Sequence, residues 1–147
     1  MIKEMKELIS EMNNDDAHEV VRWIASKKEL QGNQFRKACL LNLYDCIKYD
    51  SVKKRYLILP LNMADGVNYE GIEYEKIPYE KNYNSTVYVL EAGPDNEKLI
   101  SDYDGRYVCN CQWFQKMRMV CTHIKALHIH WKFKSLRNKC ALPLEAI

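Results

Sequence analysis

Three cysteines and one histidine fall within fifteen consecutive positions of a chain of 147 residues. They form two pairs, Cys109 with Cys111 and Cys121 with His123, with one residue inside each pair and nine residues between the pairs. Thiolate and imidazole groups with this spacing are typical of a metal site. Three sulfurs and one imidazole complete a tetrahedral shell, so we expect one structural Zn²⁺ ion. An iron–sulfur cluster is the alternative, although such clusters generally take thiolates.

The composition bears on whether these cysteines form disulfides instead. The chain is 47% hydrophobic, which is enough to bury a core without the help of disulfide bonds. It has no run of 18 apolar residues, and its N-terminal stretch lacks the unbroken apolar centre of a signal peptide. We therefore expect an intracellular protein, cytoplasmic or in the nucleoid or nucleus, and not a secreted one. In a reducing compartment, clustered cysteines are metal ligands or catalytic groups more often than disulfides.

The first third of the chain has the pattern of helices. We expect a short helix over residues 2–12 and a second one from residue 17 that ends before Gly32. A third helix is expected from about Asn33 to Tyr49. Its centre is apolar almost all round, which predicts burial and argues against the recognition helix of a helix-turn-helix. Two cysteines in this segment are expected to be small core residues, Cys39 and Cys46.

After residue 50 the pattern becomes that of strands. Strands are predicted over residues 56–59, 72–76, 86–90 and 106–111. Eight of the ten tyrosines lie between residues 51 and 107, and tyrosine favours the half-buried surface of a sheet. A stacking platform for nucleic-acid bases is the other use of such tyrosines.

The four candidate ligands lie where a strand passes into a helix. Cys109 and Cys111, at the end of the last predicted strand, would point to the same face. An apolar seam every three to four residues predicts a helix after residue 120, which places Cys121 just before the helix and His123 in its first turn. Three further side chains lie near or beyond the pattern: His128 and His130 are alternative ligands, and Cys140 is expected to be a free thiol.

The order CNC, QWFQKMRMV, CTH and IKAL resembles a SWIM zinc finger. The aromatic pair Trp113–Phe114 is similar to the family, and VYVLEAG and GRYVCNC resemble the strand pair that leads into such a finger. The resemblance covers residues 86–131 and departs from the family at Met119–Val120, where a small or turn-forming residue is common. It implies DNA binding or protein–protein contact, as in Mutator-like transposases, the transcription factors derived from them, helicase-associated proteins and partners of recombinase paralogues.

Together these patterns predict an α+β fold, with N-terminal helices packed on a small antiparallel sheet that leads into a strand–turn–helix finger. The expected parts are a helical segment (1–50), a tyrosine-rich β region (51–105), the SWIM-like finger (106–133) and a basic tail (134–147). At this length we expect them to form one compact domain.

Charge is distributed unevenly along the chain. Residues 105–144 contain eight Lys or Arg and no Asp or Glu, while the remainder holds 14 basic against 20 acidic residues. A basic face of this kind suits the phosphates of nucleic acid, and we expect DNA in preference to RNA. The expected contacts are Lys116, Arg118, Lys125, His128, Lys132, Lys134, Arg137 and Lys139.

Two other functions remain open at the level of sequence. The protein is an adaptor if the finger only holds the fold together while another surface binds a protein, such as a recombinase-like ATPase or a transcription or replication complex. It is a nuclease or transposase remnant if paired carboxylates support magnesium-dependent activity. We expect no catalysis, because four protein ligands leave the metal no position for water.

Overall fold

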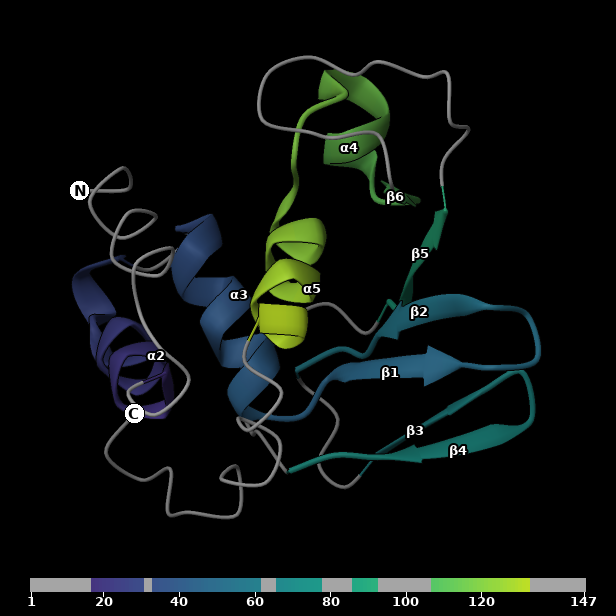
Figure 1. Ribbon diagram of the computed structural model, residues 1–147, viewed down its shortest axis with the longest axis horizontal. Helices are drawn as coiled ribbons and strands as arrows, with labels where there is room; N and C mark the ends of the chain where they lie inside the picture. The colour runs from purple at the N-terminus through teal and green to yellow at the C-terminus, as the bar shows by residue number, and fades with distance from the viewer. Residues whose placement is uncertain (1–16, 31–32, 62–65, 78–85, 93–106, 133–147) are drawn as a thin grey trace.

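A computed structural model describes residues 17–30, 33–61, 66–77, 86–92 and 107–132 (Figure 1). The fold is α+β, as predicted, with helices against small antiparallel sheets. The predicted helix over residues 2–12 and the basic tail lie outside the described residues. No helix among the described segments is both long and apolar enough to cross a membrane.

The helices stack side by side and the last of them meets the sheet. Helix α3 (Gln34–Leu43) packs between α2 (Ala17–Ser26) and α5 (Thr122–Lys132), and α5 also contacts strands of the sheet (Figure 1). The predicted second helix is confirmed by α2, whose Val21 and Ile24 side chains are fully buried. Helix α5 therefore occupies the centre of the molecule, between the N-terminal helices and the sheet.

The start of helix α3 is set by a side-chain cap, and its end is set by a change of backbone conformation. The Asn33 side chain caps its start, accepting hydrogen bonds from the N–H groups of Phe35 and Arg36. Asp45, at a φ of 53°, takes the left-handed conformation that commonly ends a helix. The predicted end at residue 49 is therefore wrong, and the chain continues as a strand.

Cys39 and Cys46 are both fully buried, as predicted, although Cys46 lies beyond the end of α3. The segment 40–47 is apolar except for Asn42 and Asp45, and such a run does not by itself distinguish a buried helix from a buried strand.

The main sheet has four antiparallel strands in the order β1-β2-β5-β6. Strands near 56–59, 86–90 and 106–111 were predicted, while the first strand was not. Strand β6 lies beside β5 at the edge of this sheet, and the first pair of candidate ligands begins at its last residue, Cys109. The strands are β1 (Ile47–Asp50), β2 (Arg55–Ile58), β5 (Tyr88–Ala92) and β6 (Tyr107–Cys109).

A separate hairpin joins β3 (Gly66–Tyr69) to β4 (Ile72–Glu75). The predicted strand over 72–76 is confirmed by β4, but β3 was not anticipated. Gly66 is required there, because a Cβ atom at this position would lie 2.5 Å from the carbonyl oxygen of Tyr74. The two strands pair in register from Gly66 with Glu75 to Tyr69 with Ile72.

A group of charged side chains connects this hairpin to the turn between β1 and β2. The Asp50 carboxylate accepts hydrogen bonds from the N–H groups of Val52 and Lys53, and it pairs with the Arg55 Nε at 3.1 Å. The same guanidinium contacts the Glu70 carboxylate at 2.5 Å. The Lys53 N–H and the Arg55 side chain both favour the ionised carboxylate, so the pKa of Asp50 lies below its ordinary value.

The charge on Asp50 should make stability depend on pH in a defined direction. A lowered folded-state pKa adds stability above the unfolded-state value of about 4, and that contribution is lost as the pH falls through the folded-state pKa. We expect Asp50→Asn to unfold at lower denaturant concentration than the wild type at pH 7, with the difference shrinking below about pH 4. Glu73→Gln, at an exposed carboxylate of β4, is the control. A difference that stays constant with pH would show that the charge of Asp50 has no such role.

Candidate metal centre

Three short elements bring the four candidate ligands together. Cys109 is the last residue of β6, and Cys111 lies at the N-terminus of α4 (Gln112–Met117), where its Sγ accepts a hydrogen bond from the Phe114 N–H. Cys121 immediately precedes α5 and His123 lies in the first turn of that helix, as predicted. Cys111 is not part of the last strand, which differs from the prediction. The segment between the ligand pairs contains the helix α4 where only a turn was expected.

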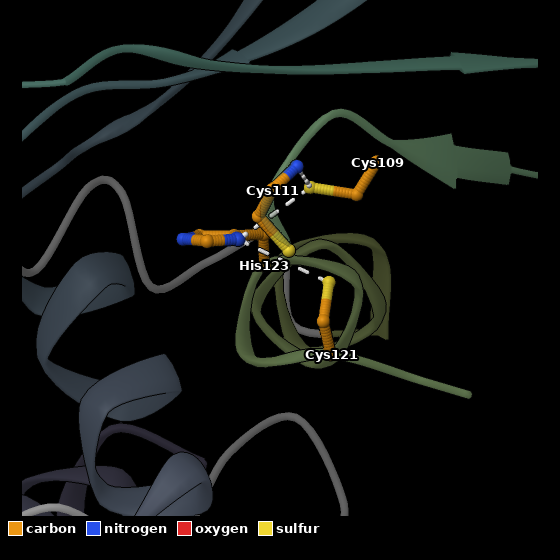
Figure 2. A group of neighbouring side chains, drawn as sticks. All are labelled: Cys109, Cys111, Cys121 and His123. Carbon is orange, nitrogen blue, oxygen red and sulfur yellow. Dashed lines mark hydrogen bonds between the residues drawn. The ribbon is translucent and has the colours of Figure 1, made fainter. Parts of the chain in front are cut away.

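The ligand atoms converge on one point (Figure 2). The Sγ atoms of Cys109, Cys111 and Cys121 and a ring nitrogen of His123 all lie within 4.8 Å of one another. The Nδ1 atom of His123 is 3.5 Å from the Cys109 Sγ and 3.9 Å from the Cys121 Sγ. Tetrahedral bonds of about 2.3 Å to sulfur and 2.0 Å to nitrogen place such atoms about 3.5 Å apart. The spacing therefore fits a single tetrahedral metal ion.

All four ligands are buried, which makes several ionised thiols unfavourable without a cation. Hydrogen bonds from Cys109 and Cys121 lower the pKa of Cys111. The Cys109 thiol has a raised pKa, because it donates to Cys111 and Cys121 and is buried. For Cys121 the contact with Cys109 lowers the pKa, but the contact with Cys111 and burial outweigh it and raise the pKa to about 12. One thiolate is therefore stabilised at the expense of the other two, and a divalent cation would remove that conflict.

Neighbouring groups fix the orientation of the ligands. The ring of Tyr88, from β5, stacks on the His123 ring with centroids 4.1 Å apart. The Gln115 side chain donates to the Cys109 carbonyl oxygen at 2.8 Å, and the Asn110 side chain accepts from the Val89 N–H at 2.9 Å. These contacts hold Cys109 to α4 and the neighbouring Asn110 to β5. Such outer contacts are typical of metal sites that keep one ligand geometry.

A cavity of about 490 Å³ lies beside the ligands. Its walls come from the start of α3, the start of α4, the start of α5 and Tyr88 of β5. This cavity could not be predicted from the sequence, because residues 33–37 and 88 are far from the candidate ligands in the chain. No spacing motif links them to the ligands. Its lining residues are Asn33, Gln34, Arg36, Lys37, Tyr88, Cys111, Gln112, Trp113, Cys121, Thr122 and His123.

The predicted nucleic-acid contacts do not share one environment. Lys116 and His128 are exposed, on α4 and α5 respectively. The half-buried Arg118 side chain lies over the Phe114 ring, at 5.7 Å from its centroid. Lys125 is half-buried, and its Nζ is 2.6 Å from the Gln34 Oε1 of α3. Helix α5 is covered by α3 as well as by the sheet. The part of its surface that is open to solvent is therefore smaller than the sequence pattern suggested.

The remaining predicted positions lie at or beyond the end of α5. Lys132 is the last residue of that helix, while Lys134, Arg137, Lys139 and the expected free thiol Cys140 lie outside the described residues. The alternative ligands His128 and His130 are not members of the ligand group. Their rings lie instead near Trp131 and Tyr56, with centroid distances of 5.9 Å and 6.3 Å respectively.

No protein-family model, curated protein sequence or solved structure matches the chain.

Loss of one ligand should abolish stoichiometric metal binding. We expect Cys111→Ala to lose bound metal and to unfold at markedly lower temperature, because metal binding at such a site can contribute on the order of 10 kcal/mol to folding. Elemental analysis and thermal unfolding measure the two effects. We expect His123→Ala to weaken metal binding in the same way.

Two matched variants serve as controls. Cys39→Ala alters a buried cysteine that lies outside the ligand group, and His128→Ala alters an exposed histidine of the same helix. Both should keep one metal ion per chain. Retention of metal by Cys111→Ala, or its loss from His128→Ala with retention in His123→Ala, would contradict the assigned ligand set.

Proposed function

We propose that the protein holds one structural Zn²⁺ ion and binds nucleic acid, DNA in preference to RNA, through the basic surface around the finger. The observation that carries the metal assignment is the convergence of three sulfurs and one imidazole nitrogen within 4.8 Å. Thiolate and imidazole ligands in a tetrahedral arrangement suit zinc, while magnesium and calcium prefer oxygen. Binding of the ion would fasten β6, α4 and α5 to one another.

The proposal includes a SWIM-like finger. The C-x-C and C-x-H pairs, the strand that precedes the first pair and the helix that follows the second are the features that support it. The helix between the pairs contains six of the nine intervening residues and ends at Arg118, which has a φ of 53°. Four protein ligands complete the shell, so the proposed role is structural and the protein is proposed not to be an enzyme.

Nucleic-acid binding is supported by the one-sided charge of the finger end. Residues 105–144 contain no Asp or Glu, and Lys116 projects from the exposed side of α4. Contacts to phosphates would make the binding steeply dependent on salt and weakly dependent on sequence.

An adaptor role is the second candidate. Trp113 and Met117 are four residues apart on α4 and remain 38% and 44% exposed. Residues at this spacing share a helix face, and exposed aromatic and methionine side chains are typical of protein-binding surfaces.

A salt titration tests the nucleic-acid proposal. We expect zinc-loaded protein to bind a DNA duplex with an affinity that falls linearly with salt on a log–log scale. The double variant Lys116→Gln/Lys132→Gln should weaken binding about tenfold at low salt and reduce the slope by up to about 2, since each lysine contributes about one phosphate contact. Fluorescence anisotropy with a labelled duplex measures both quantities.

The matched control is Lys28→Gln/Lys54→Gln, which removes the same charge at two exposed positions outside residues 106–133 of the chain. It should bind as the wild type does. Equal losses in the two double variants would indicate a nonspecific effect of net charge. Absence of binding at low salt would leave the adaptor role as the better candidate.

A further inference from the structure

The cavity beside the metal centre contains a buried cation whose Nε lacks a hydrogen-bond partner. Arg36, on α3, is 4% exposed and lines this cavity, and its Nε atom has no hydrogen-bond partner among the described residues. Buried guanidinium donors are almost always hydrogen-bonded, and buried charges are normally paired. An acceptor supplied from outside the described residues would complete this site.

The charges around the cavity leave a positive surplus. A Zn²⁺ ion with three thiolates would carry a net charge of −1, while Arg36 and Lys37 in the same wall contribute +2. No Asp or Glu is among the lining residues that the structure describes. Burial raises the pKa of Cys39, whose thiol senses the Arg36 charge, to about 12, so that thiol stays neutral and does not compensate the guanidinium. The surplus of one positive charge favours an anion.

The rest of the wall suits a planar group attached to that anion. Trp113 lies in the same wall and is 38% exposed, so part of its side chain remains accessible. The amides of Gln34 and Gln112 supply hydrogen-bond donors and acceptors beside it. A volume of about 490 Å³ lies within the range of small-molecule sites, which is roughly 300–1,000 Å³. Aromatic stacking of a base next to a cationic phosphate contact is a recurring way to hold one nucleotide.

We propose that this cavity binds a single nucleotide, with Arg36 and Lys37 holding its phosphate and Trp113 stacking on its base. The nucleotide is either free or a unit of a single strand. The second case rests on the proposed nucleic-acid function, and the first does not. Arg36 presents its donors in a planar fork, which suits the bidentate recognition of a phosphate. The start of α3 adds the favourable end of a helix dipole to the same wall.

Binding of adenosine monophosphate and of adenosine to the zinc-loaded full chain tests the site. Equilibrium dialysis and quenching of tryptophan fluorescence are the measurements. We expect the monophosphate to bind at least about tenfold more tightly than the nucleoside, because charge-assisted hydrogen bonds to the phosphate are lost in adenosine. Equal affinity for the two compounds, or binding of neither, would overturn the proposal.

Variants assign the two halves of the site. Arg36→Gln should lower the affinity for the monophosphate about tenfold and leave that for adenosine unchanged, while Trp113→Ala should lower both affinities about tenfold. Lys54→Gln, an exposed lysine in the turn between β1 and β2, should change neither. If Arg36→Gln loses zinc or fails to fold, Lys37→Gln and competition by inorganic phosphate test the same contact. If the variant that folds and keeps zinc, Arg36→Gln or otherwise Lys37→Gln, binds the monophosphate as tightly as the wild type does, the proposed site is wrong.

A ten-nucleotide strand of deoxyadenylate distinguishes the two sources of nucleotide. Competition between this strand and the monophosphate, together with weaker binding of the strand to Arg36→Gln, would assign the cavity to a unit of single-stranded nucleic acid. Binding of the monophosphate without competition would assign it to a free nucleotide. If the strand binds with a steep salt dependence but neither the monophosphate nor Arg36→Gln affects it, the cavity proposal fails and the nucleic-acid proposal stands.

Discussion

Three buried sulfurs and an imidazole nitrogen in one small space are the constraint on which the C-terminal half of the structure depends. The elements that carry them are short: β6 has three residues and α4 has six. Isolated helices of fewer than about 12 residues are marginal in water, so α4 is not stable through its own hydrogen bonds. It begins at a ligand, Cys111, whose sulfur caps it. A cation shared by the four ligands would therefore position the strand end, α4 and the start of α5 at once.

Helix α5 connects the candidate metal centre to the N-terminal helices and to the sheet. The Asn42 side chain of α3 donates to the carbonyl oxygen of Ala126, at 3.0 Å, across the contact between the two helices. At the far end of α5 the Trp131 indole donates to the Tyr56 hydroxyl of β2, at 3.0 Å. Both contacts are polar and directional, so they fix the rotation of α5 as well as its distance from its neighbours. The position of His123 at the start of the helix follows from that rotation.

The grouping of Cys109, Cys111, Cys121 and His123 could be predicted from the sequence, because a metal site requires its ligands at a characteristic local spacing that can be recognised without knowing the fold. The same is true of the seam on α5, whose Ile124 and Leu127 are fully buried. The end of α3 could not be predicted, because Asp45 reverses the chain inside an apolar run that continues on either side. Helix α4 was missed because its N-terminal cap is a metal-ligand sulfur, which is not among the preferred capping residues. The cavity was missed because tertiary packing alone brings residues 33–37 to the ligands.

The two cations of the cavity differ in what they can neutralise. Burial lowers the pKa of Lys37, and the charge of the nearby Cys111 thiolate offsets only part of that lowering. This lysine is therefore coupled to the ligands and can offset the excess negative charge of a three-thiolate zinc centre. The guanidinium of Arg36 has a buried Nε with no partner among the described residues. A three-thiolate zinc centre would neutralise only one of the two positive charges in this wall, so Arg36 and Lys37 together can still hold a phosphate.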